Sequence, residues 1–142
     1  MSIYNHILVG LDLSDESSTV LKKAVAIAKQ NTAKVSVAHI VEPLTFAYGG
    51  DVPVDMSSAQ ATVEEQADIR LKKMLEECAL PEAKSYVTVG QTSSELHRLA
   101  SENNADLIIV GCHGRHGLAL LFGSTANGVL HGTECDVLAV RV

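Results

Sequence analysis

Glycine, serine and threonine residues gather around one connection in the second half of the chain, with a spacing that suits phosphate binding. Gly111 and Gly114 directly follow an apolar run, and Gly123-Ser124-Thr125 comes after eight further residues. Glycines at the end of a strand let backbone N–H groups approach an anion, because no Cβ intervenes. A helix that starts at Gly123 adds unpaired N–H donors in its first turn. The spacing therefore predicts a phosphate-binding connection.

This connection matches neither of two well-known nucleotide motifs. A P-loop requires GxxxxGK[ST], and no lysine follows Lys84 in the chain. The dinucleotide pattern GxGxxG is absent, because the first two glycines are spaced G-x-x-G. The alternative to a phosphate site is that the glycines only shape a strand-to-helix turn.

Other reactive side chains near the connection lack the partners that their chemistry requires. His113 and His116, with Cys112, supply part of a zinc site, but structural zinc needs four ligands and the sequence shows no second cluster. Cys112 suits either a redox-sensitive thiol or a buried, inert one. Ser124 is not in the GxSxG turn of a nucleophilic serine. We therefore expect neither a metal site nor a catalytic nucleophile.

Length and composition favour one domain, residues 1–142. The net charge of −6, without clusters of Lys and Arg, argues against nucleic acid as a partner. No stretch approaches the ~20 apolar residues of a membrane span, and the first residues lack the pattern of a signal peptide. The three cysteines form no CxxC pair and suit reduced thiols. We expect a cytoplasmic protein.

Apolar runs alternate with amphipathic segments along the chain. Leu21, Ala24, Val25 and Ala28 follow helical spacing, whereas the run at 106–111 is continuous, as in a strand buried on both faces. The expected strands cover 6–11, 34–41, 84–89, 106–111 and 136–142; the expected helices start near 15, 57 or 58, 92 and 123.

Two helix starts and one loop carry further expectations. Ser14 is a natural N-cap for the first helix, which runs to about Gln30. Thr92 and Glu95 have the spacing of a capping box before the third helix. The stretch 42–55 contains two prolines and two glycines, so we expect a long loop that offers a surface to a partner.

Strands separated by helices predict a parallel sheet with right-handed crossovers. Ligands of such sheets bind at the carboxyl ends of the strands, where the strand order reverses. If the first and fourth strands are neighbours there, Asp12 lies beside the glycine connection. The chemistry of both segments would then meet in one site.

Four segments of the chain resemble the universal stress protein family: 5–14 (NHILVGLDLS), 33–41 (AKVSVAHIV), 105–114 (ADLIIVGCHG) and 135–142 (CDVLAVRV). The resemblance implies an α/β fold with a doubly wound five-stranded parallel sheet in the order 3-2-1-4-5, which is Rossmann-like and of the adenine-nucleotide α-hydrolase-like type. It also implies a homodimer through the strand at 136–142. An apolar strand at a sheet edge invites pairing with its own copy, which agrees with that expectation.

Members of this family either bind ATP through G-x2-G-x9-G-[ST] or lack these glycines and do not appreciably bind it. This chain has both glycine elements but eight residues between them, so its glycines resemble the first branch and its spacing the second. Because backbone donors matter more here than side chains, we expect nucleotide binding.

The resemblance also assigns roles to individual residues of an ATP site. Asp12 would accept a hydrogen bond from the ribose or the adenine edge. Leu11, Ile40 and Val110 would line the adenine pocket. The residues that approach the ribose and the phosphates would be Gly111, Gly114, Arg115, Gly123, Ser124 and Thr125.

The expected function is an ATP-binding, homodimeric regulatory module in the stress response, with Mg²⁺ accompanying the nucleotide and a regulatory protein as client. One alternative is a weak ATPase or a nucleotidyl or phosphoryl transferase. Against it, no Walker-type magnesium ligand or water-positioning residue accompanies Asp12. The second alternative is a dimeric scaffold that has lost nucleotide binding.

Overall fold

The computed structural model describes residues 2–43, 56–112 and 123–142. Five strands form one sheet in the order β3-β2-β1-β4-β5, and all neighbouring strands are parallel. This confirms the predicted α/β fold and its strand order. The elements are β1 (His6–Gly10), α1 (Ser17–Asn31), β2 (Lys34–Val41), α3 (Met56–Glu77), β3 (Lys84–Val89), α4 (Thr92–Glu102), β4 (Leu107–Cys112), α5 (Gly123–Leu130) and β5 (Asp136–Arg141).

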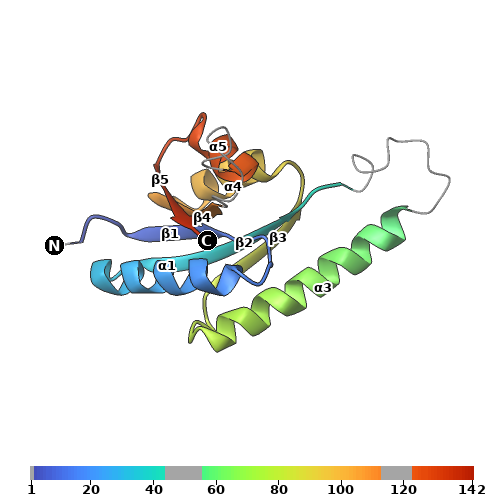
Figure 1. Ribbon diagram of the computed structural model, residues 1–142, viewed down its shortest axis with the longest axis horizontal. Coiled ribbons are helices and arrows are strands. Elements are labelled where there is room, and N and C mark those ends of the chain that lie inside the picture. Colours follow the sequence, from blue (N-terminus) through green and yellow to red (C-terminus); the bar gives the residue numbers. More distant parts are fainter. Residues whose placement is uncertain (1, 44–55, 113–122) are drawn as a thin grey trace.

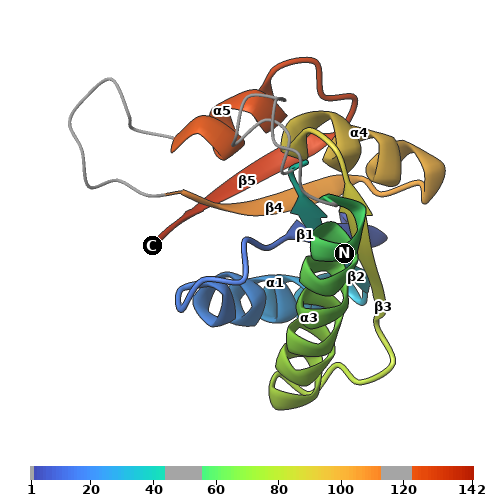
Figure 2. The same cartoon turned by 90° about the vertical axis from the view of Figure 1, so that its right-hand side faces the viewer.

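Helices cover both faces of the sheet, α1 and α3 on one side and α4 and α5 on the other (Figures 1 and 2). Side chains of β1 alternate between the two cores: Ile7 and Val9 pack with α1 and α3, and Leu8 packs with α4 and α5. Burial on both faces explains why the central strands are apolar without interruption. The edge strands β3 and β5 are mostly half-buried.

The start of α1 differs from the prediction. Ser14 does not cap the helix: Glu16 occupies the N-cap position and makes no side-chain capping bond. The Ser14 hydroxyl instead donates to the Asp12 carboxylate at 2.7 Å, and the Ser14 carbonyl accepts the Ser17 N–H at 3.1 Å. The carboxylate that precedes Ser14 therefore engages the hydroxyl that a capping role requires.

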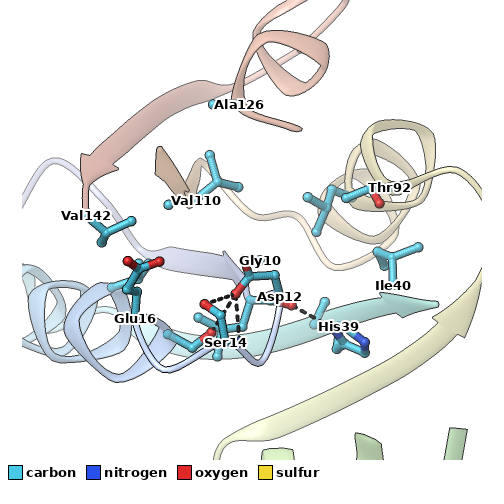
Figure 3. A pocket seen from close by; sticks show the side chains of 16 residues that line it. Gly10, Asp12, Ser14, Glu16, His39, Ile40, Thr92, Val110, Ala126 and Val142 are labelled. Carbon is cyan, nitrogen blue, oxygen red and sulfur yellow. Dashed lines mark hydrogen bonds between the residues drawn. The ribbon is translucent and has the colours of Figure 1, made fainter. Parts of the chain in front are cut away.

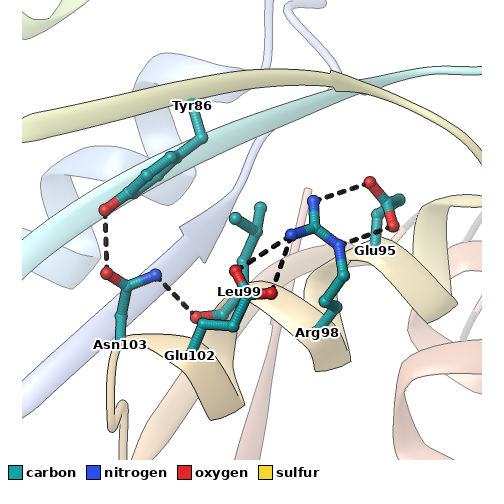
Figure 4. Close-up of polar contacts among 6 residues, drawn as sticks. All are labelled: Tyr86, Glu95, Arg98, Leu99, Glu102 and Asn103. Atoms are coloured by element: carbon teal, nitrogen blue, oxygen red, sulfur yellow. Dashed lines mark hydrogen bonds and ion pairs between the residues drawn. The ribbon is translucent and has the colours of Figure 1, made fainter.

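The capping box predicted for α4 is also wrong. Gln91 occupies the N-cap position without a side-chain capping bond. The Glu95 carboxylate accepts two hydrogen bonds from Arg98, at 2.9 and 3.0 Å (Figure 4). A bidentate bond to a guanidinium is stronger than one bond to a backbone N–H, so the Glu95 carboxylate pairs with Arg98 instead of capping the helix.

Two strand boundaries are shifted, since β1 ends at Gly10 rather than at residue 11 and β4 continues through Cys112. The expected partner loop at 42–55 lies outside the described residues beyond position 43. Among the helices in the described ranges, none combines the length and the apolar character needed to cross a bilayer.

Candidate functional site

A cavity of about 160 Å³ opens where β1, β2 and β4 end at their carboxyl side. Figure 3 shows side chains from these strands, from the turn after β1 and from α4 and α5 around it. β1 and β4 are hydrogen-bonded neighbours, so the strand order reverses between them. The pocket therefore occupies the switch point at which ligands of open α/β sheets bind.

Asp12 stands at the rim of this pocket, in the turn between β1 and α1. Its Oδ1 accepts hydrogen bonds from the Ser14 N–H at 3.0 Å, the Ser14 hydroxyl at 2.7 Å and the Ser17 hydroxyl at 3.0 Å. All these donors belong to the same turn or to the first residue of α1. These bonds within the turn help to orient the carboxylate.

The wall opposite Asp12 is apolar. Ile40 and Val110 line it from β2 and β4, and Leu96 and Ala126 line it from α4 and α5. All of these side chains are buried. Such a wall accepts a flat, apolar ring face.

The backbone of β2 offers polar groups at the same place. The Ala38 carbonyl accepts the Leu11 N–H at 2.9 Å, which is the last bond of the β1–β2 ladder. In a β-strand the N–H and C=O of every second residue point to the same side. Those of Ile40 therefore face the β1 side, as those of Ala38 do, but at a level where β1 has already ended. A donor and an acceptor thus lie next to the apolar wall.

Gly111 also lines the pocket, but its lack of a side chain also lets β4 and α1 pack closely. A Cβ at this position would lie 3.1 Å from Cγ2 of Val20 in α1. Cys112, which follows, is buried. Close approach of helix and strand is therefore sufficient reason for a glycine here, whatever binds in the pocket.

The second half of the glycine connection is placed only in part. Gly114 and Arg115 lie outside the described residues, as do His113 and His116. Gly123, Ser124 and Thr125 form the first turn of α5. The next residue of that helix, Ala126, lines the pocket, so the N-terminal end of α5 lies beside it. Among the described residues no group of three His, Cys, Asp or Glu side chains is arranged to hold a metal ion.

The family follows from comparison with known sequences. A profile of the universal stress protein family matches residues 3–141. The chain belongs to the universal stress protein family. "Universal stress protein A homolog 1" of Coxiella burnetii is 39% identical over 139 residues, covering 96% of each protein. A second homologue from that organism is 38% identical and covers 100% of this chain and 98% of its own length.

Solved universal stress proteins share the fold. One from Lactobacillus plantarum superposes with a TM-score of 0.78 at 23% identity, covering 99% of this chain and all 100% of that one. Another was solved in complex with cAMP; it has a TM-score of 0.67 and 28% identity, covering 99% of this chain and 98% of its own. The parallel sheet and its strand order are thus those of universal stress proteins.

In this universal stress protein the structure gathers Leu11, Asp12, Ile40, Val110 and Gly111 around one pocket. These residues come from three segments that are far apart in the sequence. The topology alone brings them together, since β1 lies between β2 and β4. Which ligand they bind remains a prediction.

Sequence reasoning missed several residues of the pocket. His39 donates its Nδ1–H to the Leu11 carbonyl at 2.8 Å, because a carbonyl can only accept. Glu16 brings a second carboxylate to the lining, and the described lining residues include no Lys or Arg. Glu16 was detectable as an acidic residue four positions after Asp12, at the start of a helix. No local pattern marks His39, whose place depends on the pairing of β2 with β1.

Proposed function

We propose that this universal stress protein binds an adenine nucleotide, ATP with Mg²⁺ in the first place, and acts as a homodimeric regulatory module in the stress response. The observation that carries the proposal is the pocket at the switch point, with the Asp12 carboxylate at its rim and an apolar wall. An apolar slot with a few convergent polar groups is the usual form of a small-molecule site.

The nucleoside end of the ligand fits the described residues. Adenine presents an N6 donor and an N1 acceptor, which complement the carbonyl and the N–H of Ile40 at the end of the β1–β2 ladder. The Ile40 and Val110 side chains, which line the pocket, would cover the ring faces. Asp12 would then accept hydrogen bonds from the ribose hydroxyls. A universal stress protein 28% identical to this chain was solved with cAMP, which supports an adenine nucleotide as the ligand class.

The phosphates would lie toward the first turn of α5. The N–H groups in the first turn of a helix favour negative charge. Gly111, Gly114, Gly123, Ser124 and Thr125 supply backbone and hydroxyl donors in the motif, and Arg115 would add positive charge. Mg²⁺ would reduce the repulsion between the phosphates and the two carboxylates of the lining, Asp12 and Glu16.

A binding role is favoured over turnover. The Asp12 oxygen Oδ1 already accepts hydrogen bonds from Ser14 and Ser17, which leaves it poorly suited to take a proton from an attacking water. Of the other lining side chains that can act as a base, His39 is bonded through Nδ1 to the Leu11 carbonyl, and Glu16 lies at the start of α1. The proposed output is therefore an interaction with a regulatory protein client, set by the nucleotide.

The homodimer would form through β5 and Val142. β5 is an edge strand of the sheet, and its Val137, Leu138 and Ala139 are only half-buried. A partner strand would satisfy the open edge and cover apolar surface. The three cysteines, Cys78, Cys112 and Cys135, form no disulfide with one another, which fits a reducing compartment and supports a cytoplasmic location.

Calorimetric titration of the nucleotide-stripped protein with Mg-ATP, ADP, AMP and cAMP tests the proposal. We expect binding that weakens as phosphates are removed. Gly123→Val should abolish ATP binding by crowding the first turn of α5, whereas Asn127→Val, exposed on the same helix, should leave it unchanged. Sedimentation of both variants should give the same dimer as the wild type.

Each other outcome points to a different function. Phosphate release that disappears with Asp12→Ala would establish the weak ATPase or a phosphoryl transferase. A folded dimer without heat for any nucleotide would leave a scaffold that acts through its surface. ATP affinity unchanged by Gly123→Val would contradict the placement of the phosphates.

A further inference from the structure

The turn that carries Asp12 contains a strained backbone conformation. Leu13 has a φ of 61°, in the left-handed region that L-residues with bulky side chains avoid. Within residues 2–43, 56–112 and 123–142, the other non-glycine residues with positive φ are Thr32, Ala79 and Asn104. These follow the ends of α1, α3 and α4, where a left-handed residue is a normal helix terminator. Leu13 follows a strand, next to the pocket, and has no such explanation.

Side chains from two other elements hold this turn by its carbonyl groups. His39 of β2 donates to the Leu11 carbonyl at 2.8 Å, and Arg70 of α3 donates through Nη2 to the Leu13 carbonyl at 2.6 Å. The two carbonyls lie on either side of Asp12. The Leu11 and Leu13 side chains are both buried in the core on the α1–α3 side of the sheet.

The Arg70 guanidinium bonds to this turn. Its side chain is exposed on α3, and within the described residues its one hydrogen bond is the bond to Leu13. A charged donor to a carbonyl forms one of the stronger hydrogen bonds in proteins. Strained residues persist where the surroundings hold them, and they concentrate at functional sites.

We propose that Arg70 is a positioning residue: by holding the left-handed Leu13 it keeps the Asp12 carboxylate aimed at the nucleoside end of the pocket. This inference rests on the proposed function for its ligand, but the hold on the turn does not depend on a ligand. It makes α3 a determinant of affinity, although none of the described pocket-lining residues belongs to this helix.

Two substitutions with the same change of charge test the proposal. Arg70→Met removes the donor and keeps an apolar stem, and Lys73→Met removes a charge one turn further along α3, from an exposed side chain without a partner among the described residues. Hydrogen exchange of the Ser14 and Ser17 N–H groups, in protein without nucleotide, reports on the turn, because both groups are bonded within it. We expect these N–H groups to exchange about tenfold faster in Arg70→Met than in the wild type, and at the wild-type rate in Lys73→Met.

Nucleotide affinity provides the second measurement. In Arg70→Met we expect AMP and ATP to weaken by the same factor, about tenfold, because the effect passes through Asp12 and the nucleoside. Loss for ATP with AMP unchanged would show that Arg70 acts as a charge near the phosphates and would overturn the proposal. Unchanged exchange in a folded Arg70→Met protein would overturn it as well.

Failure of the proposed function leaves a different signature. If the wild type binds no nucleotide while Arg70→Met still accelerates exchange at Ser14 and Ser17, the hold on the turn stands and only the ligand is wrong. Arg70→Lys keeps the charge and one donor and should exchange more slowly than Arg70→Met. Equal exchange rates in Arg70→Lys and Arg70→Met would show that the hydrogen bond is not the cause. The two rates can be compared even if one variant is less stable than the other.

Discussion

An aspartate lies at each end of the sheet, and the two carboxylates have different roles. At the amino side, Asp106 accepts the N–H groups of Asn5 and His6 at 2.9–3.1 Å, across about a hundred residues of sequence, and so joins β4 to the start of β1. At the carboxyl side, Asp12 Oδ1 accepts bonds from Ser14 and Ser17, which lie in its own turn or at the start of the helix that follows it. Asp106 therefore stabilises the fold, whereas Asp12 presents a carboxylate to a pocket.

The surroundings of the two aspartates differ in the same way. At the amino side His6 donates its Nδ1–H to the Asn103 carbonyl at 2.9 Å, and its Nε2 lies 2.7 Å from the Ser36 hydroxyl. The Tyr86 hydroxyl donates to the Asn103 side chain at 2.9 Å (Figure 4). These polar groups are all bonded to the chain itself. A cavity lies at each side, beside His6, Ser36 and Asn103 at the amino side and beside Asp12 at the carboxyl side. Because the amino-side polar groups are bonded to one another across several elements, we call that side the closed polar end and the carboxyl side the open end.

The largest predicted effect is on stability, at the closed end. Asp106→Asn should lower the free energy of unfolding at neutral pH by about 2 kcal/mol, because the backbone N–H groups lose a charged acceptor and meet an amide that also donates. Chemical denaturation of wild type and variant measures the difference. Nucleotide affinity should not change, and a stability equal to that of the wild type would contradict the assignment.

The difference in stability between the wild type and Asp106→Asn should depend on pH. Burial raises the pKa of Asp106, but the N–H groups of Asn5 and His6 outweigh it and hold the pKa below its ordinary value. The stabilisation is thus complete above the unfolded pKa of about 3.9 and is lost as the pH falls through the lower, folded value. The gap between wild type and Asp106→Asn should narrow below about pH 4; a constant gap would point to packing instead.

The second effect is on binding, at the open end. Asp12→Asn keeps an oxygen for the bonds from Ser14 and Ser17, so the melting temperature should change little, but the amide no longer offers two acceptors to the ribose. We expect nucleotide affinity to fall about tenfold, as for the loss of one charged hydrogen bond. Titration of both aspartate variants under the same conditions checks the contrast. Equal nucleotide affinities in Asp12→Asn and Asp106→Asn would contradict the assignment of binding to Asp12 and stability to Asp106.

The smallest effect belongs to Tyr86→Phe, again at the closed end. Removing one half-buried hydroxyl that donates to Asn103 should cost about 1 kcal/mol of unfolding free energy. The control is Arg98→Met on α4: its ion pairs with Glu95 and Glu102 are exposed (Figure 4), and its melting temperature should equal that of the wild type. A larger loss in the control would show that the surface of α4 matters more than the closed polar end.

Much of the fold was predictable because its signals are local. The strands predicted at 34–41 and, as a more polar segment, at 84–89 became β2 and β3 with the same boundaries. The helix caps were less predictable, since several acceptors compete for each donor. Ser14 is engaged by Asp12 and Glu95 by Arg98, and sequence spacing does not show which of the competing bonds is stronger.

The sequence by itself determined the parallel α/β fold, the family and the candidate residues Asp12, Ile40, Val110 and Gly111. Alternating periodicity and turn residues act over short stretches and can be read without coordinates. Only the tertiary structure decided that His39 and Arg70 hold the turn of Asp12, and that Leu13 is left-handed within it. Such contacts join segments that are 28 and 57 residues apart, and they depend on how the strands and helices pack.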